Sequence, residues 1–555
     1  MTAIITSEFR FTLADTFRDS IENNPADTNY YLFVGRPEPW GPNLPDDDLV
    51  PDTPVDSYEA KLRIWDSMMG LKKILPNSTS FVIPRFDWDS TQNTIYVPYD
   101  DSDPDLFFHP TPEEIDAANL DGTYTAGSFY VMNQFYQVFK CLSNNNGAKS
   151  QIEPVAVETN PLPVIETADG YRWKYMYTIR TGDAVKFLTD HWMPVKTLVA
   201  DDASSQWVVQ QGAQPGVIEA INIIDPGFGY IRVRQNEEFV QGVPATNQLT
   251  IDASADSTPN YYVGATVWIE AGTGAGQSRV ITAYDGTSKT LTLDEVWTTL
   301  PVAGSSTYRI LPTCTITGNG TGARAKALVD LSSPNLITGV TMADVGSGYT
   351  YAVATISGAG GQDAEVGVAL SPRGGHGSDA ARELGGRFVM INQRLQFEEG
   401  DGDFPISNDY RQLGLVRNPL NYGTTTLSTA QTRIASQRIR VQAPSGTFDT
   451  DELISASSGT VNGFLIEVQD DPDVGNPGGK ILVFTQNPET GYGDFMSLTT
   501  GDAITGQSST AVAQVVEYLA PEIERYEGDI IYYENRRPVL RAEDQLEDIK
   551  IIIEF

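Results

Sequence analysis

VIEAINIIDPGFGY (Val217–Tyr230) and ITGVTMADVGSGY (Ile337–Tyr349) are two copies of one pattern, and they decide the fold class of this chain. In each copy an alternating apolar and polar stretch runs into a Gly-x-Gly-Tyr turn, as in a strand with one buried face. A second half-repeat follows each copy, at Thr315–Ala323 and Ala354–Gly361. Repeats of this size are supersecondary units that bury their faces by stacking on each other. The sequence therefore predicts an inserted, Gly-rich β-repeat region.

The composition of the whole chain agrees with a β-rich protein. The 555 residues include 49 glycines and 33 prolines, and 40% of them are hydrophobic, enough to build packed cores. We expect a mainly β protein with an α+β core. It would consist of several antiparallel β-sandwich or barrel domains, a few N-terminal helices and the inserted repeats.

Changes of composition along the chain predict five segments, in keeping with the three to five domains expected for this length. They are an N-terminal part of a core (1–204), the repeat region (205–370) with a nested β unit at about 245–310, a middle part of the core (371–441), a second inserted β domain (442–520) and a C-terminal strand region of the core (521–555).

Two helices are expected near the N-terminus, each with an apolar stripe that faces a sheet. The stripes are Phe9, Leu13, Phe17 and Ile21 in the first helix, and Leu62, Trp65 and Met69 in the second. Thr6 or Ser7 can cap the first helix, and Asp56 with Glu59 has the spacing of a capping box for the second.

Apolar and aromatic runs predict strands elsewhere. They lie at Asn29–Gly35, Ser80–Tyr99, Gly127–Leu142, Asp169–Ile179, Gly463–Val468, Lys480–Thr485 and Ile549–Phe555. The alternation within Asp169–Ile179 is typical of a half-buried strand.

The net charge of −36 argues against several partners. So acidic a chain repels nucleic-acid phosphates and anionic membranes, and we expect it to bind neither. No basic and apolar leader opens the sequence, and no apolar run approaches the ~18 residues of a membrane span. Cys141 and Cys314 cannot form a disulfide framework and are expected to be small buried thiols. We therefore expect a soluble protein made in a cytoplasm.

Residues that could carry chemistry are few. His109, His191 and His376 match no metal-ligand spacing, and His376 with Ser378 could be imagined as base and nucleophile, although a glycine-rich turn is favoured there. The glycine runs Gly272–Gly276 and Gly318–Gly322 lack the Lys-Ser/Thr of a phosphate loop and are expected to be turns.

Clustered carboxylates leave a calcium site open as a minor alternative. The clusters are Asp100, Asp101, Asp103 and Asp105, and Asp470, Asp471 and Asp473 with Asn476. Neither has the Asp-x-Asp-x-Asp-Gly loop of a known calcium motif. A polysaccharide-degrading enzyme with two carboxylates is a further minor alternative. We expect no enzyme, no cofactor and no small-molecule substrate.

The segments that are not Gly-rich carry a series of blocks that keep their order along the chain. The blocks are Ile5–Arg10, Phe33–Trp40, Trp65–Gly70, Lys73–Pro76, Val82–Trp88, Asp169–Tyr175, Tyr410–Gln412, Asn418–Leu420 and Gly528–Pro538. In these blocks the chain resembles the dimeric baseplate wedge subunit, the product of gene eight, of T4-type contractile-tail phages. The resemblance covers about 1–200, 371–440 and 521–555, and the two Gly-rich insertions lie outside it.

The resemblance implies a structural virion protein, assembled in the host cytoplasm, that forms a β-rich homodimer. Such subunits bind other baseplate wedge subunits around the tail hub, and the rearrangement of the baseplate triggers sheath contraction. No catalytic residues come with the family. The residues expected to hold the fold or its interfaces, packing being favoured over partner contact, are Arg36, Trp40, Arg85, Trp88, Asn535, Arg536 and Arg537.

A binding module is the alternative from another functional class. Exposed Trp and Tyr side chains on the Gly-x-Gly-Tyr repeats could stack on sugars, as in a host-glycan-binding adhesin or a tail-fibre-associated protein. Such proteins usually form trimers, so the number of chains in the assembly discriminates between the two readings.

Overall fold

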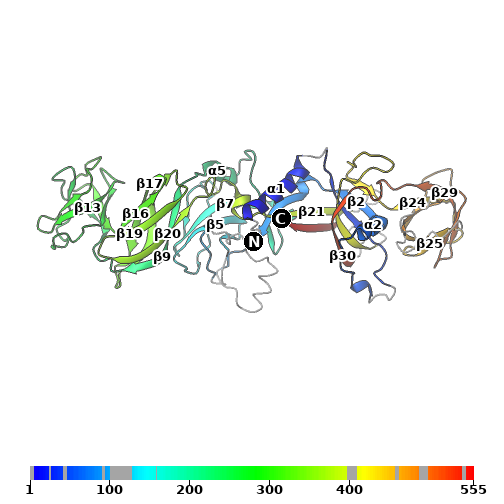
Figure 1. Cartoon of the computed structure of the whole chain (residues 1–555), viewed down its shortest axis with the longest axis horizontal. Helices are drawn as coiled ribbons and strands as arrows, with labels where there is room; N and C mark the ends of the chain where they lie inside the picture. The colour runs from blue at the N-terminus through cyan, green and yellow to red at the C-terminus, as the bar shows by residue number, and fades with distance from the viewer. Residues whose placement is uncertain are drawn as a thin grey trace. The chain divides into compact units, whose positions relative to one another are not determined.

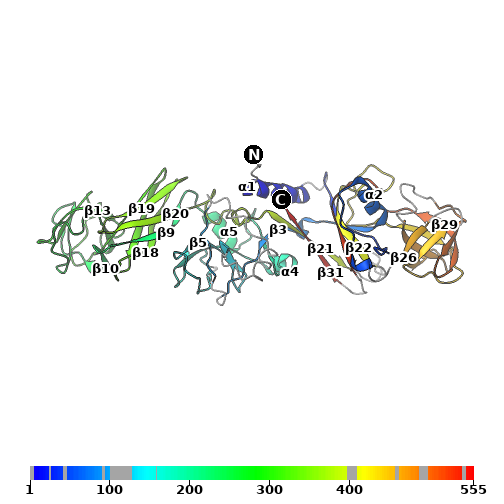
Figure 2. The same cartoon turned by 60° about the horizontal axis from the view of Figure 1, so that its bottom comes forward.

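The computed structural model describes residues 6–23, 27–41, 47–89, 94–100, 128–157, 159–396, 409–456, 462–486, 498–539 and 546–555. Strands make up 44% and helices 11%, which confirms a mainly β fold built of several antiparallel sheets. Contacts divide the chain into two compact units. Unit 1 takes the residues up to Phe11 and Phe81–Arg387, and unit 2 takes Thr12–Ser80 and Phe388–Phe555. Figures 1 and 2 show the elements of each unit.

The repeat region lies in unit 1 and exchanges strands between its two copies. Its strands are β9 (Ile218–Phe228), β16 (Thr313–Gly318), β17 (Thr321–Val329), β18 (Ile337–Ser347), β19 (Ala352–Ser357) and β20 (Gln362–Leu370). The first strand of each copy pairs with the last strand of the other, β9 with β20 and β18 with β17. The registers are equivalent, because Phe228 faces Gln362 as Ser347 faces Thr321, and both pairs of strands bulge at matching positions. The internal repeat is therefore confirmed, and its two copies interlock.

A tyrosine and a glycine lock the copies together at each Gly-x-Gly-Tyr turn. A Cβ on Gly361 would lie 2.2 Å from the ring of Tyr230, and one on Gly320 would lie 2.4 Å from the ring of Tyr349. Both rings are at most 5% exposed and belong to the core of the region. Only glycine therefore lets the rings lie flat on the neighbouring strand.

Backbone hydrogen bonds repeat the same symmetry. The N–H of Tyr349 donates to the carbonyl of Gly216 at 3.0 Å, and the N–H of Tyr230 donates to that of Asn335 at 3.2 Å. Both acceptor residues, Gly216 and Asn335, have a positive φ, and each lies two residues before the first strand of its copy. Each copy thus fixes the start of the other.

The nested unit forms a six-stranded sheet in the order β10-β15-β12-β13-β14-β11. Its strands are β10 (Arg234–Phe239), β11 (Gln248–Thr250), β12 (Thr266–Ala271), β13 (Ser278–Asp285), β14 (Thr290–Leu293) and β15 (Thr307–Leu311). Its buried side chains, such as Val267 and Tyr308, share one core with Ile218 and Val340 of the repeats. Gly272, Gly274 and Gly276 all have a positive φ, so the run is a turn, as expected. The run at Gly318–Gly322 leads straight into β17 and is also a turn.

The remainder of unit 1 holds short helices that the sequence did not reveal. They are α4 (Thr181–Phe187), α5 (Ser205–Gly212) and α6 (Ala380–Glu383). The nearby strands are β3 (Thr79–Pro84), β4 (Tyr130–Met132), β5 (Gln137–Asn144), β6 (Ile165–Glu166), β7 (Tyr171–Thr178) and β8 (Trp192–Val195). A strand forms in each of the three runs expected here, although β3 ends at Pro84, well short of Tyr99, and the prediction of a half-buried β7 is wrong. Six of its eight residues are buried, because β5 and β6 flank it and α5 packs against it.

Unit 2 contains a five-stranded sheet, the ladder between strands β21 and β31, and a closed barrel. The sheet has the order β23-β2-β1-β22-β30, from β1 (Tyr30–Gly35), β2 (Met68–Lys73), β22 (Tyr410–Arg417), β23 (Thr432–Ile434) and β30 (Asp529–Val539). In the ladder β21 (Phe388–Gln396) pairs with β31 (Leu546–Glu554). The barrel is formed by β24 (Gln437–Val441), β25 (Leu453–Ala456), β26 (Asn462–Asp470), β27 (Lys480–Gln486), β28 (Ala503–Gly506) and β29 (Val512–Leu519). The barrel encloses a core of its own, and its strands β24, β25 and β29 are labelled in Figure 1.

Both expected N-terminal helices form, with corrections to their faces. In α1 (Ser7–Glu22), Thr6 accepts a hydrogen bond from the backbone N–H of Phe9 at 3.2 Å, which confirms it as a capping residue. Phe9 and Leu13 are 52% and 40% exposed and Phe17 is only partly buried, so Ile21 alone of the expected stripe is buried. The helix is rotated so that Phe11 and Ala14 face inward instead.

In α2 (Tyr58–Ser67) the cap and the end differ from expectation. Ser57, and not Asp56, caps the helix by accepting from the N–H of Ala60. Met69 is not helical but lies in β2, since the chain becomes extended at Met68. Trp65 is buried as expected.

The tyrosine–glycine lock predicts a large effect of one methyl group. We expect Gly361→Ala to destabilise unit 1 by about 1–3 kcal/mol, because its Cβ would collide with the ring of Tyr230. Gly339→Ala on β18 is the control, since its Cβ meets nothing within 4 Å. Urea unfolding followed by fluorescence measures both. Equal stability of the two variants would refute the lock.

Candidate functional site

Five of the seven candidate residues gather in unit 2, around strands β1, β22 and β30. Arg36 and Trp40 follow β1, and Asn535, Arg536 and Arg537 lie on β30. The two strands flank β22 on either side, which brings together segments about 500 residues apart in the sequence. The arrangement forms a candidate structural or interface site.

Arg36 and Trp40 make the first contact of this site. The Arg36 guanidinium carbon lies 3.9 Å from the centre of the Trp40 ring, a cation–π contact, and its Nη2 donates to the carbonyl of Pro39 at 3.3 Å. The Trp40 indole N–H donates to the carbonyl of Arg536 at 2.7 Å. Burial lowers the pKa of Arg36 from its ordinary value. These contacts attach the chain after β1 to the edge strand β30.

A buried ion pair that the sequence did not reveal lies beneath this contact. Arg411 on β22 donates through Nε and Nη2 to the two carboxylate oxygens of Asp48, each at 2.7 Å, and through Nη1 to the carbonyl of Pro37 at 2.6 Å. Both side chains are only 8% exposed. The backbone N–H of Trp40 donates to the same carboxylate at 3.1 Å. The hydrogen bonds from Arg411 hold the pKa of Asp48 below its ordinary value.

Asn535 and Arg537 hold the segment that follows Asp48. The Asn535 amide donates to the carbonyl of Asp52 at 2.8 Å and accepts from the Gln412 amide at 2.8 Å. The Arg537 Nε donates to the carbonyl of Leu49 at 3.0 Å. Both side chains therefore serve packing within the chain.

Arg536 differs from its neighbours because its charge faces solvent. Its side chain is 47% exposed and pairs with Glu534 on the same strand at 3.1 Å. Ile531 and Tyr532 on β30 are 43% and 39% exposed. We call these four residues the β30 strip. It lies on an edge strand of its sheet, where a further chain can add.

Arg85 and Trp88 lie apart from the other five, in unit 1. Arg85 donates to the carboxylate of Asp87 and to the carbonyl of Thr189, at 3.0 and 2.8 Å. The Trp88 indole N–H donates to the hydroxyl of Ser150 at 3.1 Å. The candidate residues thus form one cluster of five and a separate pair, and all seven make contacts within the chain.

Comparison with known proteins identifies the N-terminal segment. Residues 3–102 match the model of the family described as Bacteriophage T4, Gp8. Over this segment the chain is similar to the Gp8 family. Baseplate wedge protein gp8 of Enterobacteria phage T4 is 38% identical over 90 residues, which are 16% of this chain and 27% of that protein. The match thus spans about a quarter of the relative's length.

The Gp8 segment contains both members of the first contact and half of the buried ion pair. Arg36, Trp40 and Asp48 lie inside residues 3–102, as do Arg85 and Trp88. Arg411 and the β30 residues lie outside it. The Gp8 segment is therefore folded together with strands from the C-terminal half of the chain.

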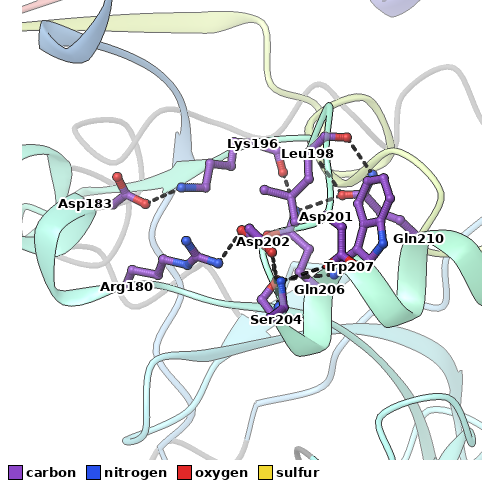
Figure 3. A network of polar contacts seen from close by, with 11 residues as sticks. Arg180, Asp183, Lys196, Leu198, Asp201, Asp202, Ser204, Gln206, Trp207 and Gln210 are labelled. Atoms are coloured by element: carbon purple, nitrogen blue, oxygen red, sulfur yellow. Dashed lines mark hydrogen bonds and ion pairs between the residues drawn. The ribbon is translucent and has the colours of Figure 1, made fainter.

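A second polar network surrounds α5 (Figure 3). The sequence analysis did not predict it. The Gln210 amide donates to the carbonyl of Leu198 and accepts from its N–H, at 3.1 and 2.9 Å. The Gln206 amide donates to the carbonyl of Lys196 at 2.5 Å. Ser204 caps α5 by accepting from the N–H of Trp207, and this Ser ahead of Gln-Trp-Val-Val was the available signal. The network fixes the segment between β8 and α5.

The candidate histidine lies in a turn, as expected. Gly374, Gly375 and Gly377 have a positive φ, and His376 between them is fully buried. Burial, followed by the charges of two buried lysines, lowers the pKa of His376 well below its ordinary value. The Ser378 hydroxyl donates to Glu383 at 3.4 Å. His109 lies outside the described residues.

The cysteines and the acidic clusters can be placed in part. Cys141 is buried, but Cys314 is partly exposed, so the prediction of two buried thiols is wrong for Cys314. Asp101, Asp103 and Asp105 lie outside the described residues. In the second cluster Asp471 binds Arg440 and Asn476, and Asp470 pairs with Lys480.

The described parts of the chain lack both a group of metal ligands and a membrane-spanning helix. They contain no group of three or more His, Cys, Asp or Glu side chains placed to hold a metal ion. They also contain no helix with both the length and the apolar character for crossing a membrane.

The buried ion pair predicts a pH-dependent stability. We expect Asp48→Asn to destabilise unit 2 by about 3 kcal/mol at pH 7, because Arg411 then loses its bidentate counter-ion and keeps only the longer contact with Asp409 at 3.7 Å. The pKa of Asp48 is lower in the folded chain, so the pair stabilises fully above its unfolded pKa of about 3.9 and stops doing so as pH falls through the folded value. The gap between wild type and variant should therefore shrink on acidification.

Thermal unfolding at pH 7 and near pH 2 measures this gap. Asp548→Asn is the matched control, since its pair with Arg394 is 32% and 43% exposed and should contribute less than about 1 kcal/mol. An Asp48→Asn variant no less stable than this control would contradict the role of the pair.

Proposed function

We propose that this chain is a baseplate wedge subunit of a contractile phage tail. It would be a structural virion protein that scaffolds wedge assembly around the hub and takes part in the rearrangement that triggers sheath contraction. The observation that carries the proposal is the match of residues 3–102 to the Gp8 family, together with the 38% identity to baseplate wedge protein gp8 of phage T4.

The structure supports extending this proposal beyond the matched segment. Strand β1 lies in the Gp8 segment and pairs along its whole length with β22, from Tyr30 opposite Arg417 to Gly35 opposite Gln412. The Asp48–Arg411 ion pair joins the same two parts. These contacts between the Gp8 segment and the C-terminal half support assigning both to one wedge core.

Domain organisation follows from the same proposal. The wedge core would comprise 1–204, 371–441 and 521–555, with the β regions 205–370 and 442–520 as additions. We propose that the core forms a homodimer and binds other wedge subunits. The net charge of the whole chain, −36, suits basic patches on such partners.

The proposed dimer predicts a defined mass in solution. Light scattering after size exclusion should give about twice the 60.6 kDa of one chain. A monomer would contradict the homodimer. A stable trimer would favour an adhesin or a fibre component over a wedge subunit.

The β30 strip predicts a variant that folds but assembles poorly. We expect Arg536→Ala to weaken co-assembly with wedge subunits about tenfold or more while leaving the melting temperature unchanged, because its side chain is half exposed and its pair with Glu534 lies on the surface. Arg394→Ala, an exposed arginine on β21, is the control. If the Arg536→Ala variant co-sediments with wedge subunits as the wild type does, Arg536 is not part of the interface. If the variant unfolds, Arg536 serves packing instead.

A further inference from the structure

A polar groove lies in unit 1, far in sequence from the Gp8 segment, where the nested unit meets the repeat sheet. Its volume is about 270 Å³. Strands β12 and β13 of the nested unit line one side, and β16 and β17 of the repeats line the other. The two sides share one continuous hydrophobic core, so the groove has fixed walls.

Two arginines in the groove are held rigidly. Arg324 donates to Asp344 through two nitrogens, to the carbonyl of Gly276 at 2.9 Å and to the hydroxyl of Ser278 at 3.3 Å. Arg279 likewise makes four hydrogen bonds, two of them to the carbonyl of Val296. A guanidinium has five N–H donors, so each arginine keeps one donor for a ligand. Their orientation costs no further entropy on binding.

Two adjacent carboxylates supply acceptors to the same groove. The Oδ1 oxygen of Asp294 accepts from the backbone N–H groups of Val280 and Glu295, at 2.9 and 3.0 Å. Within the described ranges, no side-chain hydrogen bond or ion pair involves the Oδ2 oxygen of Asp294 or the carboxylate of Glu295. Both groups line the groove with acceptor capacity unused.

The balance of these groups selects the chemistry of a ligand. Two arginines and two carboxylates line the groove, and the charge of Arg324 is already paired with Asp344, so the groove does not favour an anion. The groove thus offers both hydrogen-bond donors and acceptors, and Thr315 adds a hydroxyl. The ring of Trp268 is only 3% exposed and lies under Arg324 and Lys326, so it takes no part in stacking. A neutral molecule with several hydroxyl groups matches this pattern.

We propose that this groove binds a neutral sugar residue of a surface glycan. The carboxylates of Asp294 and Glu295 accept from neighbouring hydroxyl groups of the sugar, and the remaining N–H groups of Arg279 and Arg324 donate to its oxygens. Thr315 adds one hydroxyl contact. The site lies within the repeat region, so it goes beyond the wedge function and does not depend on it.

Saturation-transfer NMR on the full chain tests the proposal with a panel of neutral hexoses, N-acetylhexosamines and their short oligosaccharides. We expect transfer from at least one of them, with a change in tryptophan fluorescence because Trp268 lines the groove. Glu295→Gln should weaken binding of that sugar about tenfold or more, and Thr315→Val less so. Glu365→Gln, an exposed carboxylate on β20 outside the groove, should bind as the wild type does.

The controls separate a specific site from a fold defect. The carboxylate of Glu295 is exposed and makes no described hydrogen bond or ion pair, so Glu295→Gln should keep the wild-type melting temperature. Absence of transfer from every sugar in the panel would overturn the proposal. Binding that Glu295→Gln and Thr315→Val leave unchanged would also overturn it, because the sugar would then lie elsewhere.

Discussion

The buried ion pair between Asp48 and Arg411 is the constraint on which the architecture of unit 2 depends. Removing two charges from water is costly, and only bidentate geometry with further hydrogen bonds compensates for it. Here the backbone N–H of Trp40 and the carbonyl of Pro37 supply those bonds. The pair thereby orders the loop after β1, and this loop in turn carries the cation–π contact and the backbone carbonyls that Asn535 and Arg537 bind.

Unit 1 is organised by a different constraint, which is the exchange of strands between the two repeat copies. Neither copy can complete its own ladder, since β9 finds its partner in β20 and β18 in β17. The glycine under each tyrosine ring permits this arrangement, because a side chain there would collide with the ring. The sugar groove depends on this framework, since β16 and β17 form one of its sides.

Local patterns in the sequence predicted where helices and strands lie better than they predicted which side chains are buried. Alternation located β7 and β9 and the capping residue located α1, because these signals are local. The same signals failed where tertiary contacts decide. Leu13 is exposed although its spacing suits a core stripe, and Met69 extends into β2 although it continues a helical period. The partner of Arg411 lies 363 residues away in the chain, and no local pattern reports such a distance.

The resemblance to the wedge family located the candidate residues but could not say which of them would meet. Arg36, Trp40 and the β30 residues come together only because β22 lies between their strands, and Arg85 with Trp88 packs elsewhere. The pairing of β9 with β20 has a further consequence. Ile218 lies directly opposite Leu370, so the chain leaves the repeat region beside the point where it began. The residues between them therefore form a long loop whose two ends are held together by the pairing of β9 with β20. The chain on either side of this loop bears almost none of the entropic cost of closing it.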